Sequence, residues 1–117
     1  MMNHAKPDNC LFCKIIDKSI PADITFEDDE FIVFKDINPK ATIHLLVVPK
    51  EHIISLAHLS NTHTDLLGKA MLKLNQIAID NNVTNGFRTV INTGRGGGQE
   101  IDHLHFHLLA GNLRTFG

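Results

Sequence analysis

The stretch HLHFHLL, residues 103–109, constrains the fold most, because histidines and apolar residues alternate along it. Successive side chains of a β-strand point to opposite faces, whereas the same spacing would spread around a helix. His103, His105 and His107 are therefore predicted to share one face of a strand. The apolar residues expected on the opposite face are Leu104, Phe106, Leu108 and Leu109. A face this apolar favours a strand inside a sheet, with its orientation fixed.

The length and composition predict one domain spanning residues 1–117. A hydrophobic content of 43%, a charged content of 21% and a net charge of -2 are typical of a globular protein. The surplus of positive charge that general nucleic-acid binding requires is missing. Residues 1–9 are expected to form a flexible segment. No apolar run approaches the length of about 20 residues needed to span a membrane, so the sequence favours a cytoplasmic protein without membrane association.

Hydrophobic periodicity and turn residues divide the chain into two helices and five strands. The predicted helices cover residues 10–17 and 60–82, the longer because its apolar residues recur at amphipathic spacing. Short links between neighbouring strands favour antiparallel pairing. The fold class is therefore α+β, a mostly antiparallel five-stranded sheet with one long and one short helix. The predicted strands are residues 24–27, 31–36, 43–49, 87–92 and 102–111.

A glycine-rich loop, GRGGGQ at residues 94–99, leads into the histidine strand. Gly94, Gly96, Gly97 and Gly98 leave backbone N–H groups unobstructed, so the loop is expected to turn them around an anion. The loop lacks the Gly-Lys-Ser/Thr of a P-loop. A phosphate held there would lie beside the histidines, which suggests phosphoryl or nucleotidyl transfer.

Imidazole is nucleophilic when neutral, and its ordinary pKa near 6.5 leaves it mostly neutral at pH 7. His105 is the natural nucleophile because a histidine stands on either side of it. His107 or His103 is then the candidate proton donor. Two alternatives stay open: three histidines on one zinc ion with a catalytic water, and a solvated strand face without chemistry.

Four motifs follow one another along the chain: CLFCKII, FKDINPKATIHLLVVPKEHI, VINTGRGGGQE and HLHFHLLAG. Their order and spacing resemble the histidine-triad (HIT) nucleotide-binding family, and the LLAG ending is similar to its Hint branch. The resemblance implies a homodimer whose sheets join into a continuous ten-stranded sheet. It also implies hydrolysis of purine nucleoside 5′-phosphoramidates or aminoacyl-type adenylates, through a nucleotidyl-histidine intermediate, to a monophosphate such as AMP.

The resemblance also implies roles for single residues. His105 becomes the nucleophile, oriented by the His103 carbonyl, and His107 the partner of the scissile or leaving atom. His44 matches a family histidine near the site, and Asp36 would bind the ribose hydroxyls. The residues implied for the α-phosphate are Asn92, Gly98, Gln99 and Glu100, and those implied for the base are Phe12, Ile15, Phe34 and Ile37.

Some of these residues have a simpler explanation. Phe12, Ile15 and Phe34 fit a hydrophobic core from periodicity alone. A lone histidine in an apolar strand, such as His44, is more often a hydrogen-bonded core residue than a catalytic one.

The spacing Cys10-x2-Cys13 is half of a structural zinc site, which needs two further nitrogen or sulfur ligands. The resemblance to zinc-bearing relatives implies that His52 and His103 supply them, while catalysis requires no cofactor. Two buried cysteines acting as small hydrophobic residues are the alternative. A thioredoxin-like redox pair is disfavoured because no strand precedes the motif.

Three functions are consistent with the sequence: a nucleoside phosphoramidate hydrolase, a nucleotide-binding regulatory or scaffold protein with vestigial catalysis, and a dinucleoside polyphosphate hydrolase. The chain ends at NLRTFG without the tryptophan that Hint proteins often carry there. A preference for one leaving group is therefore not implied by the resemblance.

Overall fold

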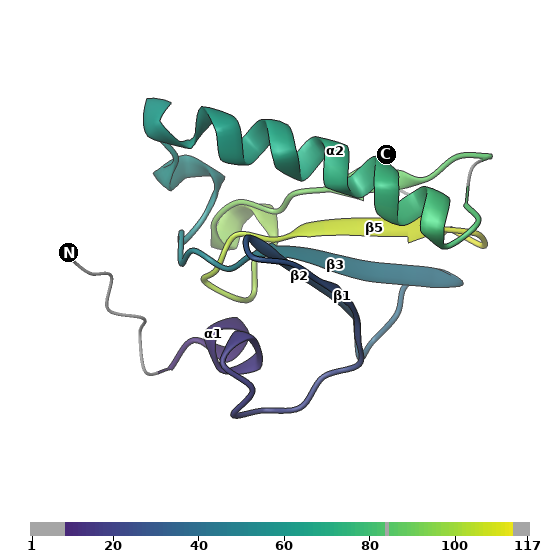
Figure 1. Cartoon of the computed structure of the whole chain (residues 1–117), viewed down its shortest axis with the longest axis horizontal. Coiled ribbons are helices and arrows are strands. Elements are labelled where there is room, and N and C mark those ends of the chain that lie inside the picture. The colour runs from purple at the N-terminus through teal and green to yellow at the C-terminus, as the bar shows by residue number, and fades with distance from the viewer. Residues whose placement is uncertain (1–8, 84, 114–117) are drawn as a thin grey trace.

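The computed structural model describes residues 9–83 and 85–113. Apart from residue 9, the segment predicted to be flexible lies outside these ranges. A single sheet separates two helices, α1 (Leu11–Ile16) and α2 (Thr64–Asp80), which lie on its opposite faces (Figure 1). The strands are β1 (Ile24–Glu27), β2 (Phe31–Lys35), β3 (Ile43–Pro49), β4 (Arg88–Val90) and β5 (Phe106–Ala110).

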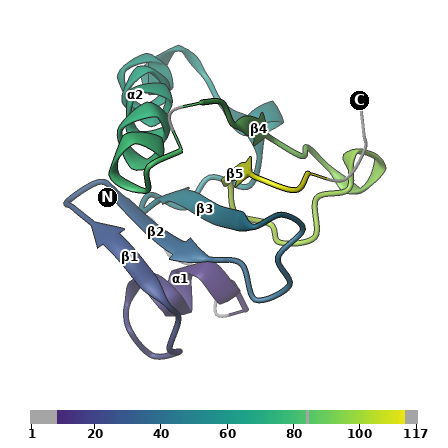
Figure 2. The same cartoon turned by 90° about the vertical axis from the view of Figure 1, so that its right-hand side faces the viewer.

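The strand order is β1-β2-β3-β5-β4, and every neighbouring pair is antiparallel (Figure 2). This confirms the predicted α+β class and the five-stranded antiparallel sheet. The central strand β3 lies between β2 and β5, and its residues from His44 to Pro49 are all buried. Within the described ranges, neither helix is long and apolar enough to cross a membrane.

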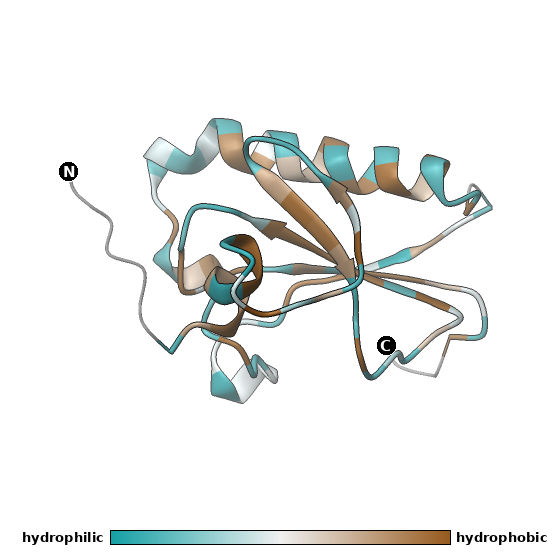
Figure 3. Ribbon diagram, turned by 60° about the horizontal axis from the view of Figure 1, so that its bottom comes forward, coloured by the Kyte–Doolittle hydropathy of each residue, from teal (hydrophilic) through white to brown (hydrophobic). Residues whose placement is uncertain are grey.

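Each face of the sheet contributes to a separate hydrophobic core. Side chains such as Val33, Val47 and Phe106 pack beneath α2, and their neighbours one residue away pack against α1. Figure 3 shows brown, hydrophobic segments in the sheet beneath the long helix α2. The residues on the α1 side are Cys10, Phe12, Cys13, Ile15, Ile32, Phe34, Leu46 and Val48. Burial of apolar side chains on both faces holds the strands, and therefore the histidines between them, in one register.

The alternation predicted for residues 103–109 holds as far as Leu108. Leu104, Phe106 and Leu108 are buried in the core beneath α2. Leu109 departs from the prediction, because it lines the same pocket as His105 and His107. It lies two residues after His107, so the period of two places it on the histidine face.

Both helices and the strands β2, β4 and β5 are shorter than predicted, and the largest differences are at the starts of β5 and α2. The strand β5 begins only at Phe106, so His103 and His105 lie in the segment before the ladder. The helix α2 begins at Thr64, after a 3-10 turn at Asn61–His63 that Ser60 caps with its side chain. Serine is a favoured residue at the N-terminal cap of a helix. Ser60 therefore marks the start of helical structure, but it does not show that the first three residues form a 3-10 turn and not the α-helix itself.

Candidate functional site

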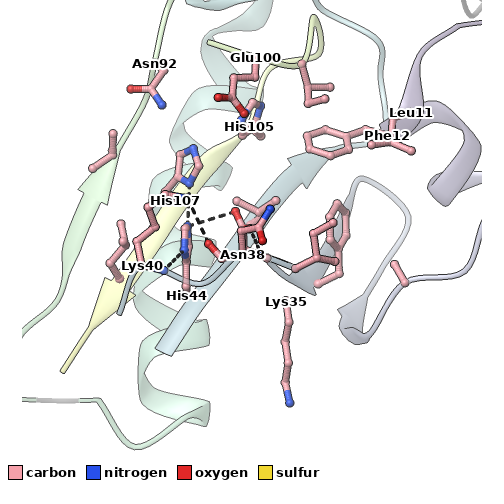
Figure 4. A pocket seen from close by; sticks show the side chains of 18 of the residues that line it. Leu11, Phe12, Lys35, Asn38, Lys40, His44, Asn92, Glu100, His105 and His107 are labelled. Carbon is pink, nitrogen blue, oxygen red and sulfur yellow. Dashed lines mark hydrogen bonds and ion pairs between the residues drawn. The ribbon is translucent and has the colours of Figure 1, made fainter. Parts of the chain in front are cut away.

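A pocket of about 660 Å³ opens on the α1 side of the sheet (Figure 4). Helix α1, strands β2 to β5 and the loop before β5 all contribute to its walls. Most of the predicted catalytic and nucleotide-binding residues meet there. Those that line it are Phe12, Ile15, Phe34, Asp36, Ile37, His44, Asn92, Gly98, Glu100, His105 and His107. Two predicted residues do not line it, Gln99 and His103.

The ring of His105 is held by a backbone carbonyl. Its Nδ1 lies 2.7 Å from the oxygen of His103, and because a carbonyl can only accept, the proton is on Nδ1. The Nε2 atom then carries the lone pair. Burial lowers the pKa of His105. The hydrogen bond to the His103 carbonyl raises this pKa, but by less, so the pKa remains below its ordinary value. His105 is thus a neutral imidazole, and Phe12 packs edge-on against it with ring centroids 5.0 Å apart.

A chain of hydrogen bonds leads from the backbone to His107. The N–H of Lys40 donates to Nδ1 of His44 at 3.0 Å, so neutral His44 carries its proton on Nε2. That Nε2 lies 2.9 Å from Nδ1 of His107, which must accept. Neutral His107 therefore carries its proton on Nε2, the one buried side-chain polar atom of the described residues without a hydrogen-bond partner. Figure 4 shows His44 between Lys40 and His107.

The surroundings of His107 strongly favour its neutral form. Burial is the largest cause, and the neighbouring His105 and His44 add to it, so that its pKa falls to about 4. The pKa of His44 is lowered as well, chiefly by burial, although the carboxylate of Asp36 opposes the change. At pH 7 the pocket thus presents neutral imidazoles with fixed tautomers.

The carboxylate of Asp36 faces the same chain. One oxygen, Oδ2, lies 3.4 Å from Nε2 of His44, and the other, Oδ1, accepts the backbone N–H of Asn38 at 2.8 Å. These contacts fix the carboxylate at the pocket wall, where a pair of ribose hydroxyls would suit its geometry. Ile37, the next residue, is 91% exposed and lines the rim of the pocket.

The glycine-rich loop differs from the predicted ring of inward N–H groups. The N–H groups of Gly97, Gly98 and Gln99 donate to carbonyls of the loop itself, at 3.0 Å each. Gly98 has a φ of 86°, which only glycine adopts readily, and it lines the pocket.

The side chain of Gln99 is fully engaged within the protein. It is buried, its Nε2 donates to the carbonyls of Ile54 and Ile101, and its Oε1 accepts the N–H of Gly94. The structure therefore shows this amide joining the loop to neighbouring backbone.

The four predicted metal ligands form a second cluster, made of Cys10, Cys13, His52 and His103. Their ligand atoms all lie within 4.8 Å of one another. Nδ1 of His103 is 3.4 Å from Sγ of Cys10 and 3.1 Å from Nδ1 of His52, and the thiols form no disulfide. Tetrahedral zinc with two sulfur and two nitrogen ligands requires ligand separations of roughly 3.3 to 3.8 Å. The sulfur–nitrogen separations of 3.3 to 3.6 Å lie within this range and the nitrogen–nitrogen separation of 3.1 Å is slightly below it, so the donor set suits a zinc ion after a small adjustment.

The tautomer of His103 fits this site too. Its Nε2 lies 2.8 Å from the carbonyl of Pro49, which must accept, so its Nδ1 carries a lone pair directed at the cluster. His105 and His107 face the pocket instead. Among the described residues no metal cluster contains all three triad histidines, so the geometry does not favour the alternative of one catalytic zinc.

Residues 9–116 match a family model described as "Scavenger mRNA decapping enzyme C-term binding". The chain is 57% identical over 102 residues to protein HitA of Neisseria gonorrhoeae, and this match covers 87% of the chain and 95% of HitA. The chain belongs to the histidine-triad family. A HIT-like protein of Synechococcus elongatus is 47% identical over 104 residues, covering 89% of this chain and 91% of that protein.

Solved histidine-triad structures share the fold closely. The HIT family hydrolase from Legionella pneumophila is 40% identical, covers 92% of this chain and 97% of its own, and superposes with a TM-score of 0.88. The histidine triad protein from Clostridium difficile is 39% identical, with coverages of 97% and 100% and a TM-score of 0.90.

The pocket of this histidine-triad protein also contains residues that the sequence did not single out. Lys35, Asn38 and Lys40 follow or end β2, and Arg88 stands on β4 in register with Leu109. Asn38 and Lys40 belong to the INPK turn that the family motif contains, which was the one available signal. The contribution of Lys40 to the histidine chain is its backbone N–H, for which no side-chain pattern exists.

Proposed function

We propose that this chain is a hydrolase of purine nucleoside 5′-phosphoramidates and aminoacyl-type adenylates that releases a monophosphate such as AMP. The observation that carries the proposal is the hydrogen bond from Nδ1 of His105 to the His103 carbonyl, which leaves Nε2 as a nucleophile in the pocket. The Nε2–H of His107 is available beside it. Similarity to solved structures described as HIT family hydrolases supports hydrolysis.

The nucleoside occupies the side of the pocket formed by α1 and β2. Phe12 and Phe34, whose ring centroids are 5.3 Å apart, and Ile15 provide an apolar wall for the base, and Ile37 covers it from the rim. Asp36 accepts hydrogen bonds from the ribose hydroxyls. Asn92, Gly98 and Glu100 lie near the histidines, where the α-phosphate binds.

Two displacements at phosphorus complete the reaction. First, Nε2 of His105 attacks the α-phosphorus and the bond from phosphorus to the leaving amine breaks. The Nε2–H of His107 donates a hydrogen bond to the leaving nitrogen, which takes up a proton from solvent and departs as the amine. Then water attacks the phosphorus and loses a proton to solvent, and the bond to Nε2 of His105 breaks to release the monophosphate.

Trapping the intermediate tests the proposal. The full chain is mixed with a slowly reacting adenosine 5′-phosphoramidate, quenched, and digested for mass spectrometry. The expected result is one adenylyl adduct on His105, with turnover reduced at least roughly 1,000-fold in His105→Ala. A substrate that binds without turnover would instead identify a nucleotide-binding regulatory protein, and faster cleavage of a dinucleoside polyphosphate would identify the other hydrolase activity.

We further propose that a structural zinc ion binds Cys10, Cys13, His52 and His103. Zinc would join helix α1 to the segments after β3 and before β5. The supporting observation is the match between the four donors and the ligand preferences of zinc. Metal analysis of the purified chain, before and after chelation, tests it, and no metal is proposed to take part in catalysis.

A homodimer is proposed along β4. Within the described part of the chain this strand pairs only with β5 and forms one edge of the sheet, so a second copy could extend it to ten strands. Leu72 and Ile79 of α2 are 72% and 54% exposed, and Phe87, just before β4, is 37% exposed. Sedimentation of the wild type and of Leu72→Glu tests the dimer, which the new charge should dissociate.

A further inference from the structure

His103 belongs to two sites at once. Its side chain contributes Nδ1 to the Cys10, Cys13, His52 and His103 cluster, while its carbonyl accepts the Nδ1–H of His105 at 2.7 Å. A single residue therefore connects the cluster to the atom that orients the nucleophile. The connection is short, because only the backbone of His103 separates its ring from its carbonyl.

The sheet does not hold this carbonyl in place. Register between β3 and β5 ends at the pair Val47 and Phe106, so His103 lies beyond the ladder. Its own N–H donates to Ile101 at 2.8 Å within a bend, and its Nε2–H donates to Pro49 at 2.8 Å. The N–H of Leu104, in the same peptide group as the His103 carbonyl, donates to the carbonyl of Ile53 at 2.7 Å. The imidazole of His103 is thus a second anchor of this backbone.

The cluster also fixes the start of helix α1. Cys10 precedes the helix and its Sγ accepts the N–H of Cys13 at 3.2 Å, so both thiols belong to the first turn. Phe12, between them, packs edge-on against His105. The six-residue helix is too short to be stable alone, so its position depends on the α1-side core and on the cluster.

We infer that Cys10, Cys13 and His52 are positioning residues for the nucleophile, which act through the ring of His103. A divalent metal ion held by the cluster restrains that ring and the first turn of α1 together. This restraint keeps the His103 carbonyl on Nδ1 of His105 and the Phe12 ring against its edge. The inference rests on the proposed function, in which His105 attacks the substrate.

The test compares two histidine substitutions in the full chain. His52→Asn removes one ligand, whereas His58→Asn changes a histidine outside the cluster and serves as the matched control. Zinc binding is measured by titration with Zn²⁺ alone, and the tautomer of His105 by its ¹⁵N signals, at a temperature where circular dichroism shows every variant folded.

The wild type and His58→Asn are expected to bind zinc and to show His105 with its proton on Nδ1. His52→Asn is expected to bind zinc at least roughly tenfold more weakly, as ligand loss commonly does, and to show His105 exchanging between tautomers. Chelation of the wild type should reproduce this change, and added Zn²⁺ should reverse it. With a phosphoramidate substrate, kcat should fall by on the order of 10- to 100-fold while KM changes little.

Two results would overturn the inference. One is a zinc-free wild type or His52→Asn in which His105 keeps the wild-type tautomer and kcat, and the other is a wild type that binds no zinc at all. The zinc and ¹⁵N measurements need no substrate. A chain that hydrolyses no phosphoramidate would therefore disprove the proposed function while the test of the metal cluster still gives its answer.

Discussion

Nε2 of His44 lies 2.9 Å from Nδ1 of His107, and this contact determines which nitrogen of His107 carries its proton. The order of donors begins at the backbone N–H of Lys40, which cannot reverse its direction. A histidine that would otherwise exchange between two neutral tautomers is thereby kept with Nε2–H toward the pocket. His44 therefore does more than fill space in the core: its N–H fixes the tautomer of His107, the proposed partner of the leaving atom.

Two substitutions of His44 separate its hydrogen bond from its volume. His44→Gln keeps an N–H donor near the Nε2 position, whereas His44→Met keeps a comparable volume and donates nothing. We expect kcat to fall by roughly tenfold in His44→Met and much less in His44→Gln. Steady-state kinetics with an adenosine phosphoramidate measures both, and equal losses in the two variants would show that His44 acts by packing.

The low pKa of His107 predicts a loss of stability in acid. In the unfolded chain this histidine takes up a proton near pH 6.5, whereas in the folded chain it does so only near pH 4. Between these values the unfolded state binds more protons, so the free energy of unfolding falls as the pH falls, by at most on the order of 3 kcal/mol. Urea unfolding of wild type and His107→Asn from pH 7 to pH 4.5 measures it. Any effect of pH on the metal cluster is the same in both chains. A free energy of unfolding that falls equally with pH in wild type and in His107→Asn would therefore contradict the prediction.

Asp36 should distinguish ribose from deoxyribose. A hydrogen bond to a charged group contributes about 1.5–3 kcal/mol, so Asp36→Asn should raise KM for a ribonucleoside substrate roughly tenfold or more. KM for the 2′-deoxy substrate should change less. The Asn38 N–H can still be accepted by the new amide oxygen, which preserves the local turn. An equal rise for both substrates would mean that the carboxylate acts on the phosphate site through His44.

Much of the fold followed from sequence periodicity. The bounds of β1 and β3 are those predicted, because their turn residues and the closing Pro49 mark them clearly. The start of β5 could not be predicted, because extended residues before a strand show the same alternation as residues in its ladder. His103 and His105 are in this extended segment.

The site was predictable where side chains make it. The motif residues His105, His107, Asp36 and Phe12 all line one pocket. What the sequence could not show is the direction of backbone groups, such as the N–H of Lys40 and the loop amides that donate within the loop. These depend on φ and ψ angles, which the identity of the residue only weakly restricts.

The amide of Gln99 is expected to stabilise the fold. Gln99→Leu would leave the carbonyls of Ile54 and Ile101 and the N–H of Gly94 without their partner in a buried place. Each unsatisfied group costs about 1–3 kcal/mol, so the free energy of unfolding should fall by roughly 3 kcal/mol or more. Urea unfolding at pH 7 measures the change.

Asn61→Leu, in the exposed turn before α2, is the control for the Gln99 substitution. It likewise replaces a side-chain amide by leucine, but where solvent surrounds the side chain, and should alter the free energy of unfolding by less than about 0.5 kcal/mol. If Gln99→Leu were instead as stable as the wild type but bound AMP more weakly, its amide would have to reach the α-phosphate, as the family resemblance implies. That outcome would require the loop to rearrange when the nucleotide binds, because all three amide contacts hold Gln99 away from the pocket in this structure.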